Sequence, residues 1–160
     1  MIEIGSPFPL FALPADSGKT VACTDLAGKP FVLFFYPKDD TESCTRENQE
    51  FSALAGKFKK AGVRVFGVSP DSVKKHGKFR DKYQLKLPLL ADADRTLIEA
   101  LGLWVEKHLY GRAYMGVERT TYLVDADGRL AQVWSKVRVP GHAAEVFAAA
   151  KALGVSQSVA

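Results

Sequence analysis

The sequence is poor in cysteine, with two cysteines among 160 residues, and it has no long hydrophobic run and no block of like charges. Two cysteines do not make a disulfide scaffold, and a chain of this length buries a core large enough not to need one. No apolar segment approaches the roughly 20 residues of a membrane-spanning helix, which argues against a membrane protein. The 22 basic residues are mostly interleaved with the 18 acidic ones, so the net charge of +4 does not predict a nucleic-acid-binding face.

The amino terminus, Met1–Pro7, has neither the positive start nor the apolar stretch of a secretory signal peptide. Together with the low number of cysteines, this predicts a cytoplasmic protein whose thiols are kept reduced. The sequence shows no internal repeat, linker or low-complexity segment. We therefore expect a single domain over residues 1–160, with a loose tail at residues 155–160.

Hydrophobic periodicity and turn residues predict an alternation of strands and helices. The expected elements are a hairpin around Asp16–Gly18, a strand at 31–36, a helix that stops at Gly62, a strand at 63–68, a helix capped by Ser69 and running through Tyr83, a helix from Asp92 to Leu101, strands at 120–125 and 130–136, and a final helix from about His142 to Leu153. Alternating elements imply parallel strands with right-handed crossovers, and the last two strands add an antiparallel pair. This order matches the thioredoxin-like α/β fold, a central mixed sheet flanked by helices with an amino-terminal hairpin.

Cys44 is the candidate nucleophile of the chain. It follows the apolar run Phe31–Tyr36 and stands where a helix is expected to begin. The converging backbone N–H groups and the macrodipole at a helix start favour a thiolate there. An ordinary thiol with a pKa of about 8.5 is only roughly 3% ionised at neutral pH, so full ionisation gains about thirty-fold. Any larger acceleration must come from groups that position the peroxide and stabilise the transition state.

Three residues complete a candidate site for attack of this thiolate on a peroxide. Thr41 is placed to turn its hydroxyl toward the sulfur or a bound oxygen, and Pro37 to shield the pocket from water. Arg119, at the start of a predicted strand, is the best candidate for the cation that the departing oxygen requires. The alternative interpretation is that Cys44 is a small buried residue and Thr41 a helix cap. The strand before the motif and the helix after it favour the functional interpretation.

Several blocks of the sequence resemble the peroxiredoxins, and most closely their bacterioferritin comigratory protein or peroxiredoxin Q subgroup. The segment Tyr36–Thr45, with Glu47 and Phe51, is similar to the peroxidatic motif of that family. Further similar blocks lie at 67–72, 87–92, 110–121 and 125–128. The resemblance therefore extends from about Ile4 to Leu153, and several blocks in the right order are more specific than one short motif.

The resemblance implies a thiol-dependent peroxidase. In the family, the position of Cys44 attacks hydrogen peroxide or an alkyl hydroperoxide and becomes a sulfenic acid. The positions of Pro37, Thr41 and Arg119 complete the peroxide pocket, and that of Glu47 supports its hydrogen bonding.

No metal ion or organic cofactor is implied by the resemblance. The dispersed histidines His76, His108 and His142 are interpreted as core or surface residues rather than ligands. The pair Asp39 and Asp40 resembles a metal pair only superficially, and a solvated loop is the better interpretation.

The sequence departs from many members of this subgroup at the position of the resolving cysteine. Gln49 stands five residues after Cys44, and the predicted helix over 69–83 has no cysteine either. The other thiol is Cys23, which we expect in a strand without a redox role. The alternative, an unusual resolving cysteine, requires a large opening of the Cys44 helix to meet disulfide geometry. We therefore predict a one-cysteine mechanism in which thioredoxin, glutathione with glutaredoxin, or a small thiol reduces the sulfenate.

The leading hypothesis for function is an enzyme that reduces small hydroperoxides. An alternative is a redox relay or sensor, in which the same sulfenate oxidises partner proteins and forms a persistent mixed disulfide with one of them. A third hypothesis, a holdase-like binding protein, has no specific support in the sequence. Members of the subgroup are often monomeric, so we expect a monomer or a modest homodimer.

Overall fold

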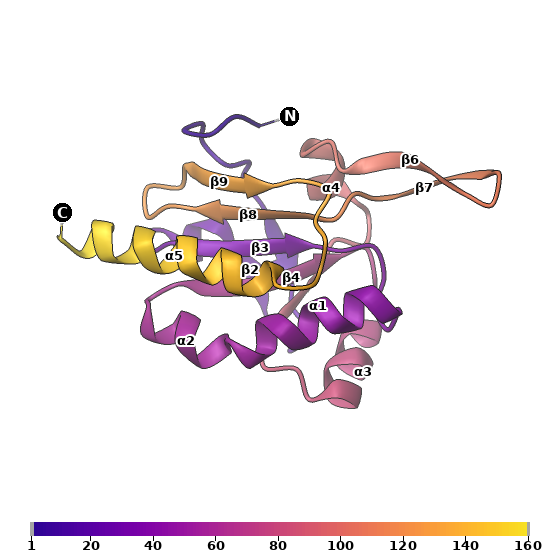
Figure 1. The fold of residues 1–160 in the computed structure, drawn as a ribbon, viewed down its shortest axis with the longest axis horizontal. Helices are drawn as coiled ribbons and strands as arrows, with labels where there is room; N and C mark the ends of the chain where they lie inside the picture. Colours follow the sequence, from indigo (N-terminus) through magenta and orange to yellow (C-terminus); the bar gives the residue numbers. More distant parts are fainter. Residues whose placement is uncertain (1, 160) are drawn as a thin grey trace.

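The computed structural model of the chain describes the backbone of residues 2–159 and the side chains of residues 2–154. A five-stranded sheet with the strand order β5-β4-β3-β8-β9 forms its centre (Figure 1). Its strands are β3 (Phe31–Phe35), β4 (Arg64–Ser69), β5 (Leu89–Ala91), β8 (Thr120–Val124) and β9 (Leu130–Trp134). Because β3 pairs in parallel with β4 and antiparallel with β8, the sheet is mixed, as the sequence predicted.

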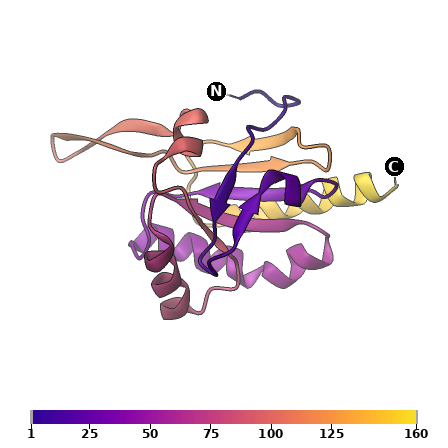
Figure 2. The ribbon, with the colours of Figure 1, turned by 180° about the vertical axis from the view of Figure 1, so that it is seen from behind.

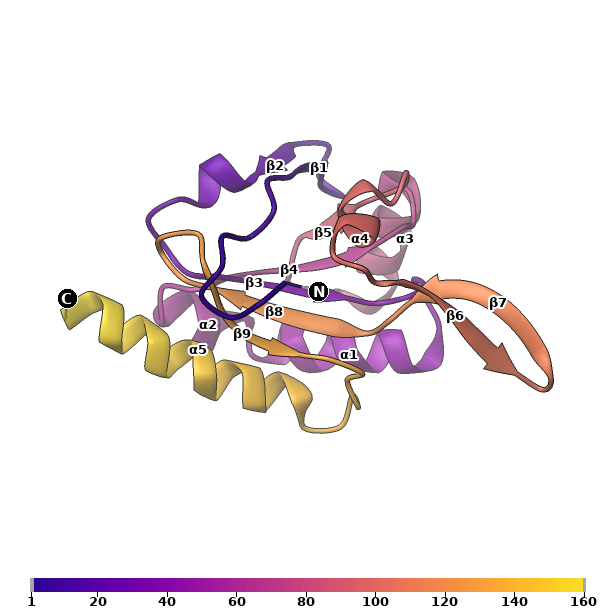
Figure 3. The ribbon, with the colours of Figure 1, turned by 90° about the horizontal axis from the view of Figure 1, so that it is seen from above.

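Helices and a hairpin cover the two faces of this sheet. The helices are α1 (Glu42–Ala53), α2 (Ala55–Lys60), α3 (Val73–Tyr83), α4 (Thr96–Ala100) and α5 (His142–Val159), with a short 3-10 helix η1 (Cys23–Leu26). Figure 3 shows α1, α2 and α5 on one face, and α4 with the hairpin of β1 (Ala12–Pro14) and β2 (Thr20–Ala22) on the other. The thioredoxin-like arrangement is therefore confirmed.

The alternation of side chains along β3 divides the core into two clusters. Leu33 and Phe35 belong to the first cluster, under the amino-terminal hairpin and α4. Val32 and Phe34 belong to the second cluster, under α1 and α5, together with Cys44. Since neighbouring side chains of a strand point to opposite faces, the two clusters lie on opposite sides of the sheet.

The amino-terminal hairpin is confirmed, but Cys23 does not lie in its second strand as expected. The backbone N–H of Ala22 donates to the carboxylate of Asp25 at 3.0 Å, which ends β2 and turns the chain into η1. Cys23 is the first residue of η1. The strand prediction was wrong for Cys23 because it did not take this local side-chain hydrogen bond into account.

Several predicted helix bounds are wrong, and α4 begins at Thr96 rather than at Asp92. Ser69 is the last residue of β4, and the N-cap of α3 is Ser72, whose hydroxyl accepts a hydrogen bond from the backbone N–H of Lys75 at 3.2 Å. The helix expected to run to Gly62 is interrupted at Leu54, where α1 ends and α2 begins.

The sequence did not predict β5 or the hairpin of β6 (Trp104–Leu109) and β7 (Arg112–Val117). This hairpin projects from the body of the molecule (Figures 1 and 2). Its strands are mostly exposed, so they show no apolar alternation for a sequence pattern to detect. It matters for the site because β7 leads directly into the segment that carries Arg119.

The carboxyl-terminal helix α5 begins at His142, as predicted. The helix does not end at about Leu153 as predicted but continues to Val159, so all but the last residue of the predicted loose tail at 155–160 has helical backbone, and residue 160 lies outside the described residues. Over the residues that the structure describes, no helix is both long enough and apolar enough to cross a bilayer.

Candidate active site

The strand–loop–helix around Cys44 forms as the sequence predicted. β3 ends at Phe35, and Thr41 is the N-cap of α1 with extended backbone angles (φ −93°, ψ 158°). The backbone N–H of Thr45 donates to the carbonyl of Thr41 at 2.8 Å, and the side-chain amide of Asn48 donates to the carbonyl of Cys44 at 2.9 Å. Cys44 therefore lies in the first turn of α1, with its side chain only 1% exposed.

Arg119 brings a positive charge to the sulfur of Cys44. Its Nη2 lies 3.4 Å from Cys44 Sγ, and its Nη1 donates to Glu47 Oε1 at 2.6 Å. A guanidinium at this distance stabilises a thiolate, and the carboxylate of Glu47 fixes the orientation of the fork. The structure thus brings together three of the residues that the sequence singled out.

Glu47 is a buried carboxyl group, with only 1% of its surface exposed. Burial raises the pKa of Glu47 to about 7, although the charge and the hydrogen bond of Arg119 act in the opposite direction. Its second oxygen, Oε2, has no hydrogen-bond partner among the residues that the structure describes. The charge of this carboxyl group therefore changes in the physiological pH range.

Thr41 and Pro37 lie in the loop before α1, but in the part of the chain that the structure describes neither side chain hydrogen-bonds to the sulfur. The hydroxyl of Thr41 is exposed and donates to the carbonyl of Lys38 at 3.0 Å, which closes the loop. Pro37 is partly exposed directly after the buried end of β3. Their contacts with a bound peroxide stay predictions.

Lys107 on β6 is a further cation near the site, and the sequence did not point to it. Its pKa is lowered, first by partial burial and then by the positive charge of Arg119, while the charge of Cys44 acts in the opposite direction. Its ammonium group therefore lies within electrostatic reach of both. The exposed hairpin that carries it left no periodic signal in the sequence.

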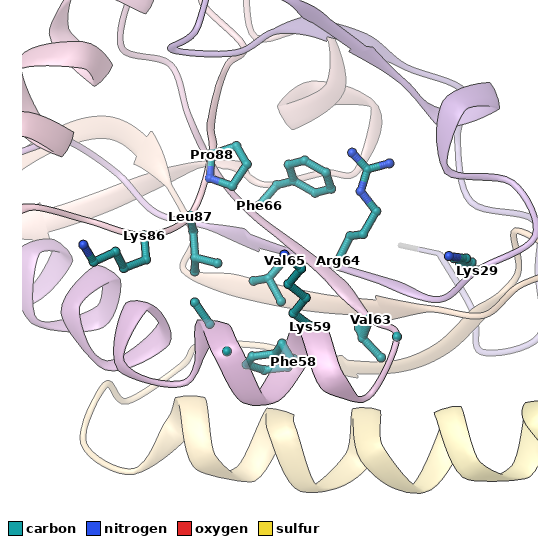
Figure 4. Close-up of a pocket in the computed structure, with 13 residues that line it drawn as sticks. Lys29, Phe58, Lys59, Val63, Arg64, Val65, Phe66, Lys86, Leu87 and Pro88 are labelled. Atoms are coloured by element: carbon teal, nitrogen blue, oxygen red, sulfur yellow. The ribbon is translucent and has the colours of Figure 1, made fainter.

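A pocket of about 310 Å³ opens beside the start of α1. It is lined by Glu42, Ser43, Arg46, Arg119, Val137, Arg138, Val139 and Pro140. Three arginines against one glutamate make it positively charged, and Arg119 links it to Cys44. A different pocket, of about 460 Å³, is walled by Phe58, Val65 and Leu87 with lysines at its edge (Figure 4), and neither Cys44 nor Arg119 lines it.

Cys23 lies away from this site. Its sulfur accepts a hydrogen bond from the backbone N–H of Phe11 at 3.4 Å, and its side chain packs against the first core cluster. Cys44 belongs to the second cluster, so the sheet separates the two free thiols. A disulfide needs two Cα atoms within about 7 Å, so a Cys23–Cys44 bond requires a large opening of the helix that carries Cys44.

The three histidines lie in different surroundings. His76 and His142 are buried, and His108 is exposed on β6. His142 Nε2 lies 2.8 Å from Thr121 Oγ1 on β8, and its ring packs edge-on against Phe51 of α1 with the ring centroids 5.8 Å apart.

Comparison with known proteins places these features in a family. The model of the AhpC/TSA family matches residues 4–133. The chain is 48% identical over 145 residues to the putative peroxiredoxin bcp of Coxiella burnetii, covering 91% of this chain and 96% of the relative. It is 45% identical over 146 residues to the peroxiredoxin Bcp of Bacillus subtilis, covering 91% and 93%. A solved structure of the bacterioferritin comigratory protein of Xanthomonas campestris, described for the alkyl peroxide reduction activity of that protein, is 41% identical with a TM-score of 0.85, covering 90% and 92%.

Proposed function

Because this chain belongs to the AhpC/TSA family and is a thiol-dependent peroxidase, we propose that Cys44 is the sulfur that reacts with the peroxide. The observation that supports this most directly is the 3.4 Å contact between Cys44 Sγ and Arg119 Nη2 at the first turn of α1. The thiolate attacks one peroxide oxygen and the O–O bond breaks. The sulfur becomes a sulfenic acid, and the other oxygen takes a proton and leaves as water or an alcohol.

Arg119 has two roles in this proposal. Its guanidinium stabilises the thiolate before the reaction and the negative charge on the departing oxygen during it. Glu47 holds Arg119 in place through the 2.6 Å hydrogen bond. Thr41 leaves its bond to the Lys38 carbonyl and donates to the bound peroxide, and the ring of Pro37 shields that oxygen from water.

We propose hydrogen peroxide and small alkyl hydroperoxides as substrates. The activity described for the Xanthomonas campestris relative supports the alkyl class. The positive pocket beside Arg119 suits an oxygen that gains negative charge.

The experiment that tests this assignment is trapping of the sulfenic acid. The reduced protein is treated with one equivalent of hydrogen peroxide or tert-butyl hydroperoxide and a sulfenate-specific reagent, and its peptides are then analysed by mass spectrometry. An adduct on Cys44, absent in Cys44→Ser and present in Cys23→Ser, supports the proposal. An unmodified Cys44 while the peroxide is consumed overturns it.

We further propose a one-cysteine mechanism with an external thiol reductant, either thioredoxin or glutathione with glutaredoxin. The support is the position of Cys23 and Cys44 on opposite faces of the sheet. The proposal includes a cytoplasmic location, where such reductants keep thiols reduced, and a monomer or modest homodimer. Turnover of Cys23→Ser with each reductant at the wild-type rate is the expected result, and loss of turnover in that variant would contradict the mechanism.

A further inference from the structure

The loop between β3 and α1 is attached to α3 through two aspartates. Asp39 is 8% exposed, and its Oδ2 lies 2.6 Å from Nδ1 of His76, which is fully buried on α3. Asp40 is exposed and contacts Lys82 Nζ at 2.8 Å and Tyr83 Oη at 2.7 Å. The prediction of a solvated loop is therefore wrong for Asp39, which is part of a buried polar network.

A third aspartate, Asp71, supports the backbone of this loop. The N–H of Asp39 donates to Asp71 Oδ2 at 2.8 Å, and the hydroxyl of Ser69 donates to the same oxygen at 2.6 Å. Lys75 Nζ lies 3.9 Å from the other oxygen of Asp71. Asp39, Asp71 and His76 bring possible metal-ligand atoms within 4.8 Å of one another, but hydrogen bonds already account for these atoms.

The hydrogen bonds of His76 fix the number of protons in this network. Nε2 lies 2.9 Å from the carbonyl oxygen of Leu90, which only accepts, so Nε2 carries a hydrogen. In a neutral imidazole Nδ1 is then an acceptor, and so is an ionised carboxylate. The hydroxyl of Tyr36 donates to the other oxygen of Asp39 at 2.6 Å and leaves Oδ2 to His76. A 2.6 Å contact between two acceptors is unfavourable, so one proton must lie between Asp39 and His76.

This buried bond is close in sequence to the reacting sulfur. Asp39 stands two residues before the N-cap Thr41 and five before Cys44. We propose that Asp39 and His76 are positioning residues, which fix the loop to α3 through the hydrogen bond between them and so hold Cys44 against Arg119. They act through the loop and do not touch the substrate. The inference rests on the proposed role of Cys44.

Two substitutions of Asp39 separate its hydrogen bonds from its charge. In Asp39→Asn the side-chain amide N–H donates to the neutral Nδ1 of His76, and the side-chain oxygen accepts from Tyr36. This variant therefore keeps both hydrogen bonds that attach the loop, but it has no shared proton. Asp39→Ala removes both bonds. We expect the rate constant for oxidation of Cys44 by hydrogen peroxide to fall about tenfold or more in Asp39→Ala, and to stay within about threefold of wild type in Asp39→Asn.

His76→Gln is a second variant, and it is designed to keep the hydrogen bond to the Leu90 carbonyl. Glutamine retains a donor for the Leu90 carbonyl but does not reach Asp39, so we expect the same slowing as in Asp39→Ala. A downfield proton resonance from the short bond is expected in the wild-type NMR spectrum and should disappear in Asp39→Asn. The spectrum checks the short bond itself, and the rate of His76→Gln keeps the inference testable where Asp39→Ala does not fold.

A control separates positioning from loss of stability. Leu97→Ala empties a buried site on α4, in the first core cluster on the other face of the sheet, and should destabilise the fold without slowing Cys44. Wild-type rates in Asp39→Ala and His76→Gln, or equal slowing in Leu97→Ala, overturn the inference. Failure of the proposed function looks different, because Cys44→Ser would then still reduce peroxide.

Discussion

Cys44 and Glu47 lie three residues apart on α1 and share the guanidinium of Arg119, which reaches the sulfur at 3.4 Å and the carboxylate at 2.6 Å. Residues at this spacing lie on one face of a helix, so a single cation contacts both side chains. The guanidinium is planar and presents its donors as a fork, so it can contact the sulfur and the carboxylate at the same time. The position of the cation relative to the sulfur therefore depends on the carboxyl group beside it.

Replacing Arg119 by lysine should slow the reaction of Cys44 with peroxide by about 100-fold or more, because a single ammonium group cannot hold both Glu47 and the sulfur. The rate constant for hydrogen peroxide, measured by competition with a reporter peroxidase, checks this. Arg129→Lys is the matched control. Arg129 donates its hydrogen bond to the backbone carbonyl of Gly5, close to the amino terminus. Equal rates in the two variants would contradict the role given to Arg119.

The buried carboxyl group of Glu47 should make the stability of the protein depend on pH. Its pKa is about 7 in the folded state, against 4.5 as the ordinary value. Between these values the folded state holds a proton that the unfolded state has lost, so stability decreases as pH rises through this window. The full loss is about 3 kcal/mol, and it is complete above the folded pKa.

Glu47→Gln tests this dependence, because a glutamine keeps a hydrogen-bond acceptor for Arg119 and has no proton to lose. Urea unfolding at several values between pH 5 and pH 8 should show a falling wild-type stability and a flatter curve for the variant. Parallel curves for the two proteins would show that another group controls the pH dependence.

Local signals made the centre of the fold and the position of Cys44 predictable. Five consecutive buried residues form β3, and the polar loop and helix start that follow place Cys44 where the sequence put it. The helix bounds that failed, at Ser69 and Leu54, depend on single side-chain and backbone hydrogen bonds. The extent of a single domain over residues 1–160 stays a prediction.

Contacts between distant elements could not be predicted in the same way. His76 follows Asp39 by 37 residues, and nothing in the periodicity of α3 tells which of its residues faces the loop. Lys107 lies on a hairpin whose exposed strands have no apolar alternation. Arg119 was found because it stands at the start of a predicted strand and because of the resemblance, but its bond to Glu47 could be seen only in the fold.

Gly67 in β4 should tolerate no side chain. A Cβ atom there would lie 2.9 Å from Leu89 Cδ2 and 2.9 Å from Phe34 Cζ, in the middle of the sheet. Gly67→Ala should therefore lower the free energy of unfolding by about 1–3 kcal/mol. Gly56→Ala is the matched control, because Gly56 lies in α2 with open space around its Cβ position, and it should stabilise the protein by up to about 1 kcal/mol. Urea unfolding of both variants measures the difference, and the same sign for both would contradict the packing argument.

Separation of the two thiols by the sheet should make Cys44 prone to over-oxidation. With no second cysteine on its own face, the sulfenic acid has no internal thiol to condense with. Excess hydrogen peroxide without a thiol reductant should therefore carry Cys44 on to sulfinic acid and abolish activity, and Cys23→Ser should be inactivated at the same rate as wild type. The gain of two oxygens on the Cys44 peptide, followed by mass spectrometry over time, measures this step. A Cys23–Cys44 disulfide that protects the wild type but not Cys23→Ser would show that the helix carrying Cys44 opens during the cycle, and would replace the one-cysteine mechanism.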